Sequence, residues 1–406
     1  MSPALSRDVI RALPKTDLHL HLDGSIRIPT LIELARDLGV ALPSQTEQGL
    51  TELVFRESYE SLPDYLRGFG LTCAVLQGRE AIERVAYELA LDNLTEGVRY
   101  IEVRFAPQLH ARPGFDALDA LRAVSAGLER AKSEFNRRPE VQSGAEPPFE
   151  FGIIACAMRY FDERFSAYHK AFLDLHRYSD PDRVYALASL EMARAAAIAR
   201  EEHGLPVVGF DLAGPEKGYP PMDHREAYDF AHRHFLRKTV HAGEDYGPES
   251  IFQAITELHA DRIGHGTSLL NPAAIQDPAI RDRDAYVREL TQFIADRRIT
   301  LEVCLTSNQQ TNPALRDLAR HPLGEMLARR LSVTLCTDNR TVSRTTVTDE
   351  ILKAVGTFGI GLKDLKNIIV YGFKRSFFPG AYAQKREYVR RCMEYFERVI
   401  AQAGLA

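Results

Sequence analysis

Two histidines lie two residues apart near the start of the chain and alternate with leucines, within Thr16–Gly24. In an extended strand, this alternation places the imidazoles of His19 and His21 on one face and the leucines on the other. Imidazole nitrogens are common ligands of zinc and its first-row neighbours. Alone, such a pair more often belongs to a strand whose histidines have ordinary polar partners. The pair is therefore half of a candidate metal site.

Three later segments supply the remaining metal-binding side chains. A third imidazole, His241, is followed three residues later by the carboxylate of Glu244. Another histidine, His265, lies between two glycines, and Asp338 follows an apolar run. Three or four nitrogen and oxygen ligands with a position left for water are typical of a catalytic zinc site, whereas structural sites favour cysteine. The predicted ligands are His19, His21, His241 and Asp338.

These residues predict metal-assisted hydrolysis. A bound zinc ion lowers the pKa of its water toward neutrality and so generates a nucleophile. His265 is placed to orient that water and to accept its proton. Glu244 is the candidate proton donor to the substrate, although a carboxylate at a helix N-terminus is also common because it interacts well with the helix dipole. The glycine before Glu244 and the aspartate after it favour a tight loop that faces a ligand.

Eight short β-rich runs, separated by long helical segments, position these side chains. Helical patterning is clearest over residues 79–96, where the apolar residues share one face. Eight strands alternating with helices indicate an α/β fold of parallel units that close into a barrel. Nearly every strand ends in polar residues, which in a barrel meet at the carboxyl-terminal mouth. An open doubly wound sheet would need a glycine-rich phosphate turn after the first strand, and none is present. The predicted strands span 16–20, 98–105, 149–155, 206–212, 238–241, 262–264, 300–304 and 332–336.

Three segments fall outside a plain barrel. Residues 38–70 contain a helical face of apolar side chains that either packs in the core or covers the mouth as a lid. Residues 136–148, with three prolines, predict a surface loop, and residues 348–406 predict helices that cap the barrel. Without repeats or linkers, we expect a single domain over residues 1–406. The apolar face consists of Leu62, Tyr65, Leu66 and Phe69.

Composition excludes several classes of partner and compartment. The 406-residue chain has a formal net charge of -5, which argues against a nucleic-acid or anionic-membrane partner. Its five cysteines are scattered and odd in number, as expected for reduced thiols in a cytoplasmic protein. Residues 1–14 lack the apolar region of a signal peptide, and no apolar run is long enough to span a membrane. We therefore expect a cytoplasmic location.

Seven ordered motifs, each at a predicted strand end, allow a family to be suggested. They are His-Leu-His-Leu-Asp-Gly-Ser at 19–25, Tyr-Ile-Glu-Val-Arg-Phe-Ala-Pro at 100–107, Gly-Phe-Asp-Leu-Ala-Gly-Pro-Glu at 209–216, His-Ala-Gly-Glu at 241–244, Arg-Ile-Gly-His-Gly at 262–266, Glu-Val-Cys-Leu-Thr-Ser-Asn at 302–308 and Thr-Asp-Asn at 337–339. With them, the chain resembles the adenosine deaminases of the metal-dependent amidohydrolase superfamily over essentially its whole length. The resemblance implies a TIM barrel that binds one zinc ion (Zn2+) per subunit and hydrolyses the 6-amino group of a purine nucleoside. It places zinc on the four ligands predicted above.

The resemblance also implies catalytic roles. Glu244 would protonate N1 of the purine, which makes C6 electrophilic. The zinc-activated water, oriented by His265 and Asp338, would attack C6, and ammonia would leave. The implied partners are thus a small purine nucleoside and water.

Further residues match the nucleoside-binding positions of the family. Gly214 matches a glycine whose backbone N–H meets N3, and its lack of a Cβ lets the base approach closely. Asp23 matches an aspartate that accepts a hydrogen bond from the ribose 5′-hydroxyl, and His21 lies in the same motif. Asn339 stands where many members carry a second aspartate that must be protonated to donate to N7, and an amide donates without that proton. The apolar residues that cover the bound nucleoside in the family are matched here by Leu62, Tyr65, Leu66 and Phe69.

Adenosine, together with 2′-deoxyadenosine, is the predicted substrate, giving inosine or its deoxy form plus ammonia. Relatives that act on free adenine tend to carry glutamate at the position of Asp23, and AMP deaminases need basic residues to pair the phosphate. Aminodeoxyfutalosine, a nucleoside-like compound, remains an alternative. A non-catalytic nucleoside-binding relative would be expected to lose Glu244 or a ligand, and all are present. The relative preference among 6-aminopurines and the oligomeric state stay open.

Overall fold

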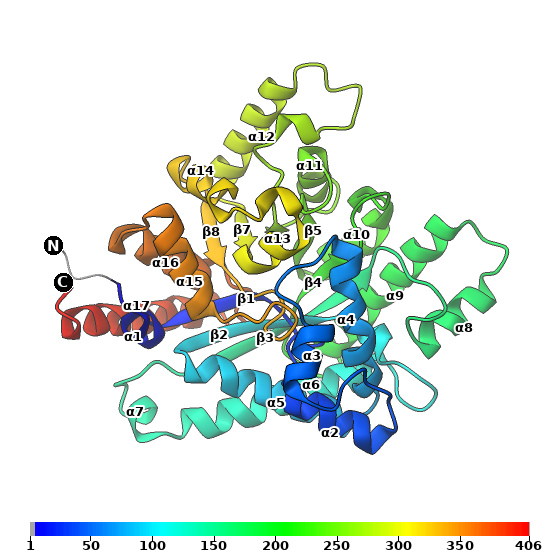
Figure 1. Ribbon diagram of the computed structural model, residues 1–406, viewed down its shortest axis with the longest axis horizontal. Helices are drawn as coiled ribbons and strands as arrows, with labels where there is room; N and C mark the ends of the chain where they lie inside the picture. Colours follow the sequence, from blue (N-terminus) through cyan, green and yellow to red (C-terminus); the bar gives the residue numbers. More distant parts are fainter. Residues whose placement is uncertain (1–4, 406) are drawn as a thin grey trace.

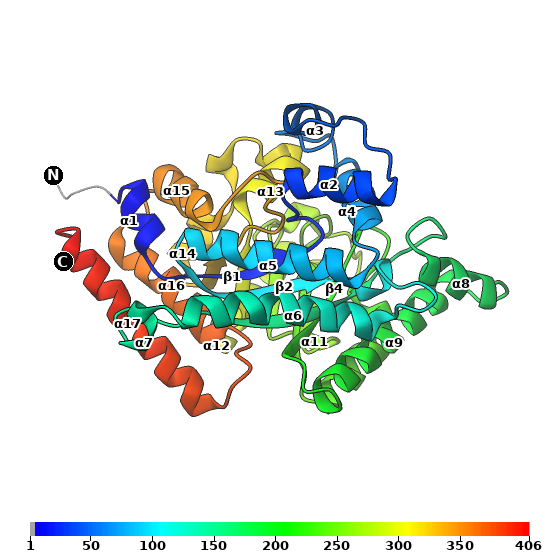
Figure 2. The same cartoon turned by 90° about the horizontal axis from the view of Figure 1, so that it is seen from below.

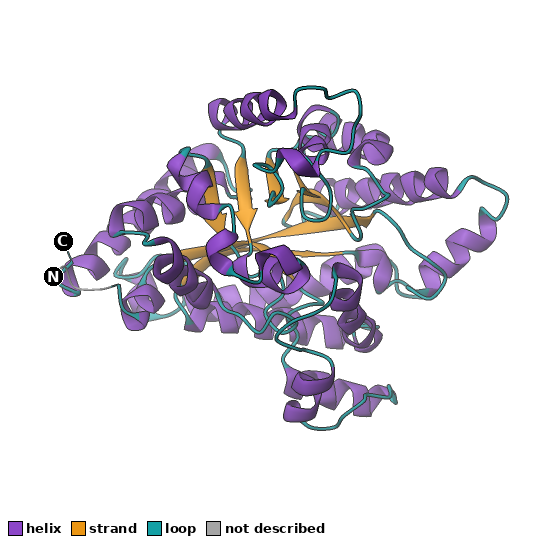
Figure 3. Cartoon of the chain, turned by 45° about the horizontal axis from the view of Figure 1, so that its top comes forward, coloured by secondary structure: helices purple, strands orange, loops and turns teal. Residues whose placement is uncertain are grey.

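The computed structural model describes residues 5–405 and is built around eight parallel strands. The strands form one sheet in the order of the chain, so that each strand pairs with the next one. Helices surround the strands on the outside (Figures 1 and 3). The strands are β1 (Lys15–His21), β2 (Val98–Phe105), β3 (Glu150–Met158), β4 (Val207–Ala213), β5 (Arg237–Ala242), β6 (Arg262–His265), β7 (Thr300–Val303) and β8 (Ser332–Leu335).

The barrel closes between β1 and the residues that follow β8. The Asp338 N–H donates to the His19 carbonyl at 2.8 Å, and the His21 N–H donates to the Asp338 carbonyl at 2.8 Å. Leu20 and Asp338 accordingly form a parallel bridge outside the regular strands. The predicted (β/α)8 TIM barrel is confirmed, and all eight predicted strands are present within a few residues of their expected bounds.

The strands are buried on both faces, as expected when side chains fill the barrel interior and helices cover the outside. Figure 2 shows α5 (Arg79–Thr95) and α6 (Ala117–Asn136) side by side along one flank. The other helices are α1 (Arg7–Ala12), α2 (Ile28–Leu38), α3 (Glu47–Leu53), α4 (Leu62–Val75), α7 (Pro139–Gln142), α8 (Ala167–Leu175), α9 (Pro181–Glu201), α10 (Arg225–Arg233), α11 (Pro248–Thr256), α12 (Arg283–Arg297), α13 (Leu305–Thr311), α14 (Leu323–Ala328), α15 (Val347–Phe358), α16 (Leu362–Arg375) and α17 (Tyr382–Gln402).

Side-chain caps mark where several helices begin. Ser61 caps α4 by accepting the Asp64 N–H, and Asp116 caps α6 by accepting the Asp119 N–H. Such caps satisfy backbone donors that have no partner within the helix. The start of α4 is therefore encoded locally, directly before the four apolar residues at 62–69.

The three segments outside the plain barrel contain helices, and in one of them a loop was expected. Residues 38–70 contain α3 and most of α4, and residues 348–406 carry α15, α16 and α17, of which α16 packs on β1 and β8. The expected loop at 136–148 contains the four-residue helix α7. Proline is favoured in the first turn of a helix, so Pro139 starts α7 rather than preventing it. Within residues 5–405, no helix is both long and apolar enough to cross a bilayer.

Candidate active site

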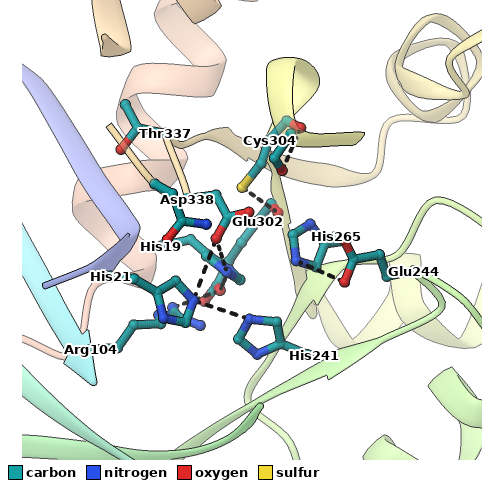
Figure 4. A network of polar contacts seen from close by, with 12 residues as sticks. His19, His21, Arg104, His241, Glu244, His265, Glu302, Cys304, Thr337 and Asp338 are labelled. Atoms are coloured by element: carbon teal, nitrogen blue, oxygen red, sulfur yellow. Dashed lines mark hydrogen bonds and ion pairs between the residues drawn. The ribbon is translucent and has the colours of Figure 1, made fainter. Parts of the chain in front are cut away.

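Side chains from the ends of three strands and from the turn after a fourth meet at the carboxyl-terminal end of the barrel (Figure 4). His19 and His21 end β1, His241 lies in β5, His265 is the last residue of β6, and Asp338 follows β8. One possible ligand atom from each of His19, His241, His265 and Asp338 lies within 4.8 Å of the others. The His21 Nε2 atom is 3.3 Å from His241 Nε2 and 3.4 Å from Asp338 Oδ1. The structure thus brings the four predicted ligands into one cluster.

Two buried carboxylates set the orientation of the imidazoles. The Nδ1–H of His19 donates to Glu302 Oε2 at 2.8 Å, and the Nδ1–H of His241 donates to Asp211 Oδ2 at 3.0 Å. In the neutral, metal-binding form of these rings, the free lone pair is then on Nε2, and the buried His19 Nε2 has no hydrogen-bond partner in the described part of the chain. Carboxylates that hold the outer nitrogen of a histidine are typical of metal sites. The donor set and its orientation fit a divalent metal ion.

Buried arginines balance these carboxylates. Arg104 donates to Asp211 at 2.9 Å and to Glu302 at 2.8 Å, and Arg262 donates to Glu302 at 2.6 Å and also to Glu102. Burial alone would raise the pKa of Glu302, but the two guanidinium groups beside it hold that pKa well below its usual range. Glu302 is thus ionised and accepts the hydrogen bond from His19.

Glu216 holds the turn that carries Glu244. Its carboxylate accepts the backbone N–H groups of Gly243 at 2.7 Å, of Glu244 at 2.9 Å and of Asp245 at 2.9 Å. This places Glu244 Oε2 3.6 Å from His265 Nε2, so the carboxyl group faces the cluster (Figure 4). Burial, together with the negative charge of Asp338, raises the pKa of Glu244 to about 8. The group is therefore mostly protonated at neutral pH and can donate a proton.

A hydrogen-bond relay determines which nitrogen of His265 carries its proton. The backbone N–H of Leu323 donates to His321 Nδ1 at 3.1 Å, so the neutral His321 carries its proton on Nε2, 3.3 Å from Asn308 Oδ1. The Asn308 Nδ2 atom then donates to His265 Nδ1 at 3.0 Å. Burial lowers the pKa of His321 to about 4, which keeps its ring neutral. In this arrangement the neutral His265 presents an Nε2–H to the cavity.

This tautomer favours one of the two roles predicted for His265. An Nε2–H can donate to the attacking oxygen and so orient it. Accepting a proton at the same nitrogen requires the other tautomer, in which the Asn308 amide is turned and its oxygen accepts from His265 Nδ1.

Two of the cluster residues have an unusual backbone conformation. His265 has φ 63° and Asp338 has φ 62°, in the left-handed region that non-glycine residues rarely adopt. Such strain is typical of functional sites, where the surrounding structure enforces it. The preceding Gly264 also makes room for the cluster, because a Cβ there would lie 2.9 Å from the His19 ring.

A cavity of about 700 Å³ opens from the cluster. Its wall is formed by residues at the carboxyl-terminal ends of the strands and by residues of α4. Its lining contains the remaining predicted residues: His21, Asp23, Leu62, Tyr65, Leu66, Phe69, Gly214, Glu244 and Asn339. At Gly214, φ is 103°, so backbone conformation also requires glycine there. The structure brings the predicted positions together in one cavity, and their individual roles stay predictions.

Hydrogen bonds connect the α4 face to the turn after β8. The Asn339 Nδ2 atom donates to Tyr65 Oη at 2.7 Å, and Tyr65 Oη lies 2.7 Å from Ser343 Oγ. An amide carries two hydrogens, so one of the Asn339 hydrogens stays free for a purine acceptor. Tyr65 is therefore a polar anchor of α4 as well as part of its apolar face.

Sequence reasoning left several functional positions without a role. Asp211, Glu302 and Arg104 were visible only as polar residues at strand ends. Glu216 ends the 209–216 motif, and Asn308 ends the 302–308 motif. His321 had no signal, because it lies outside the strand-end motifs and acts only through Asn308.

Comparison with known proteins places this architecture among deaminases. A family model described as adenosine deaminase matches residues 14–393. An adenosine deaminase of Mycobacteroides abscessus is 36% identical over 385 residues, which cover 93% of this chain and 94% of that protein. Adenosine deaminase 1 of Streptomyces coelicolor is 35% identical over 384 residues, covering 93% and 86%.

Solved structures share the fold at lower identity. An amidohydrolase from Burkholderia ambifaria, solved with bound Zn, superposes with a TM-score of 0.76 at 21% identity, covering 100% of this chain and 96% of that chain. An adenine deaminase from Arthrobacter aurescens gives a TM-score of 0.73 at 23% identity, covering 95% and 100%. These likenesses support the fold alone.

Proposed function

The chain belongs to the adenosine deaminase family, and from this premise we propose how it hydrolyses adenosine to inosine and ammonia. One observation carries the proposal: a cluster suited to a metal and the protonated carboxyl group of Glu244 face the same cavity. Hydrolysis at C6 of a purine needs both a nucleophilic water and a proton donor to the ring.

We infer that the ion is zinc, one per chain, held by His19, His21, His241 and Asp338. Three imidazoles and one carboxylate match the ligands of catalytic zinc sites. The outer hydrogen bonds to Glu302 and Asp211 support this by leaving Nε2 atoms free to coordinate. A bound zinc ion lowers the pKa of its water and so supplies a nucleophile at neutral pH.

The residues around the cluster then act on the substrate. Glu244 donates its proton to N1, which draws electrons from C6. His265 donates through Nε2–H to the attacking oxygen and orients it toward C6. Asp338 accepts a hydrogen bond from the same oxygen. The α4 face excludes bulk water from the cavity as a lid, held by the Tyr65 hydrogen bonds.

A nucleoside fits the remaining residues better than a nucleotide. Asp23 accepts the 5′-hydroxyl in this proposal. Burial raises the pKa of Asp23 to about 7, and its ionised form would repel a phosphate. The two arginines that line the cavity are highly exposed and lie beside carboxylates of their own segments: Arg67 contacts Asp64 at 3.4 Å, and Arg164 contacts Asp162 at 2.6 Å. Gly214 and Asn339 would meet the base at N3 and N7. Aminodeoxyfutalosine, adenine and AMP remain the alternatives that a substrate panel must test.

The proposed location is the cytoplasm. All five cysteines are buried free thiols, which is consistent with a reducing compartment.

The decisive experiment compares kcat/KM for adenosine, 2′-deoxyadenosine, 5′-deoxyadenosine, AMP and adenine. Adenosine should be the best or equal best substrate. Loss of a hydrogen bond to a charged group costs about 1.5–3 kcal/mol, so 5′-deoxyadenosine should be roughly 10- to 100-fold poorer. A higher kcat/KM for adenine or AMP than for adenosine would contradict the substrate assignment.

A second experiment tests the metal. The His241→Ala variant should lose metal and activity together, and a metal-free variant with full activity would contradict the metal assignment.

A further inference from the structure

A second group of metal-binding side chains lies outside the cluster described above. Asp23 follows β1, Cys73 lies in α4, and His110 follows the short 3-10 helix Pro107–Leu109 after β2. One possible ligand atom from each lies within 4.8 Å of the other two. All three residues are buried, with exposed fractions of 3%, 8% and 0%. A carboxylate, a thiol and an imidazole therefore converge beside the proposed ribose-binding residue.

His110 is oriented for coordination. Its Nδ1–H donates to the Leu76 carbonyl at 2.9 Å, which leaves Nε2 with a free lone pair. Among the described residues, that buried Nε2 atom has no hydrogen-bond partner, and neither does Asp23 Oδ1. Buried polar atoms without partners are uncommon and call for a specific explanation. Two such acceptors within one group indicate a positively charged or hydrogen-bond-donating ligand.

The thiol of Cys73 favours a metal ion over a ligand that only donates hydrogen bonds. Cys73 Sγ lies 3.9 Å from Asp23 Oδ2, and a sulfur, an oxygen and a nitrogen ligand atom of the three residues lie within 4.8 Å of one another. Thiolate with imidazole selects soft or borderline divalent ions, zinc foremost, over magnesium and calcium. We propose that Asp23, Cys73 and His110 form a second, lower-affinity site for zinc. On binding, the Cys73 thiol loses its proton to solvent, and the thiolate and carboxylate together balance the charge of the ion.

Occupation of this site would regulate the enzyme, a consequence that rests on the proposed function. An ion held by Asp23 removes the acceptor of the ribose 5′-hydroxyl and lies in the cavity that the nucleoside enters, because Asp23 and Cys73 both line it. Zinc in excess of the catalytic ion should therefore inhibit in competition with adenosine. The apparent KM would rise with zinc concentration while kcat extrapolated to saturating adenosine stays constant.

The test uses the zinc-loaded enzyme, its Cys73→Ala variant and a control, Cys392→Ala, which removes a buried thiol of α17. Equilibrium dialysis in excess zinc with elemental analysis should find one more ion per chain in the parent and the control than in Cys73→Ala. Cobalt(II) added to the zinc-loaded enzyme should give a thiolate-to-cobalt absorption band that Cys73→Ala lacks, because no catalytic ligand is a thiolate.

Kinetics provide a separate readout. Loss of even an outer partner of a metal ligand typically costs 10- to 100-fold in metal affinity, so loss of the Cys73 ligand should raise the half-inhibitory zinc concentration by more than about 10-fold. Equal zinc binding by parent and Cys73→Ala, or a cobalt spectrum without the band, would overturn the second site. A His110→Gln variant that raises the KM for adenosine with unchanged zinc binding would overturn it in favour of a ribose contact. The binding measurements need no turnover, so they stand even where adenosine proves to be the wrong substrate.

Discussion

Glu244 is protonated because of where the Glu216-bound turn places it, buried and facing Asp338. Replacing it with glutamine keeps the shape and hydrogen-bonding capacity but removes the transferable proton. Since general acid catalysis contributes about 10²- to 10⁴-fold, Glu244→Gln should lower kcat by that factor. The metal content should not change. Steady-state kinetics with elemental analysis checks both, and the exposed Glu163→Gln is the matched control. More than about a tenth of the parent kcat in Glu244→Gln would exclude it as the proton donor.

The His321–Asn308 relay gives His265 its tautomer, so it should influence catalysis without touching the substrate. His321→Phe removes the donor to Asn308 Oδ1 and frees the amide to turn. One lost buried hydrogen bond is worth about 1–1.5 kcal/mol, so kcat should fall roughly 10-fold with a smaller change in KM. Nitrogen NMR of labelled histidine should show the Nε2–H form of His265 in the parent and a tautomer mixture in the variant. Unchanged kcat and tautomer would refute the relay, and His321→Gln, which retains an amide donor, should restore part of the rate.

At the scale of residues, the predicted ligands and Glu244 came from short motifs at the ends of apolar runs. Those signals are local, because a strand end is recognisable from its own sequence. The partners of the ligands are not local. Glu302 in β7 reaches His19 in β1, two strands that are not neighbours in the sheet, and Asn308 in α13 reaches His265 in β6. Such pairs depend on the closed geometry of the barrel and could not be assigned before it was known.

The helix α4 lines the cavity, and one hydroxyl group connects it to the turn after β8. Tyr65→Phe keeps the apolar face but leaves the Asn339 amide and the Ser343 hydroxyl without their partner. Each unsatisfied buried group costs about 1–3 kcal/mol in the closed state, so α4 should open more often. We expect the KM for adenosine to rise roughly 10- to 100-fold, with a smaller effect on kcat.

Hydrogen exchange provides the structural check on this anchor. Amides of α4 should exchange faster in Tyr65→Phe than in the parent, while those of β1 should not change. Tyr59→Phe is a suitable control, because its hydroxyl also lies near this turn but contacts only backbone groups. Equal KM and equal exchange in α4 would show that Tyr65 does not anchor the helix.

At the scale of elements, the strands were predictable because parallel strands buried on both faces appear as continuous apolar runs. Helix α5 was equally clear from its apolar periodicity, which matches Arg79–Thr95 almost to the residue. The short helices α3 and α7 were not predicted. Seven and four residues are too few to show a helical period, and prolines near α7 suggested a loop instead.

Three buried histidines far apart in the chain each make a contribution to the stability of the whole molecule that is lost in acid. Burial lowers the pKa of His169 and His321 to about 4 and that of His224 to about 3. Their unfolded pKa is about 6.5, so between these values the unfolded chain binds more protons than the folded chain. The stability contributed by these three histidines is therefore full above about pH 6.5 and falls as the pH decreases, by up to about 1.4 kcal/mol per pH unit for each histidine. Buried carboxyls with a raised pKa, such as Glu244, act in the opposite direction, so the histidine contribution is measured as a difference between variants.

Urea unfolding at several pH values between 7 and 5 measures this dependence. His224→Gln should reduce the slope of unfolding free energy against pH by up to about 1.4 kcal/mol per unit relative to the parent. The histidines of the proposed metal site are the same in both proteins, so their effect cancels in the difference. Identical slopes would mean that His224 is protonated in the folded chain.

The pairing between β1 and Asp338, which lies in the turn after β8, has a consequence for how the chain is made. Asp338 both pairs its backbone with β1 and offers its side chain to the cluster, so the first strand and the turn after the last strand are joined at the proposed metal ligands. During synthesis, His19 leaves the ribosome early, whereas Asp338 emerges only after more than three quarters of the chain. A nascent chain therefore cannot assemble the complete set of proposed ligands until the barrel is nearly finished, and loading of the proposed ion would report on completion of the fold.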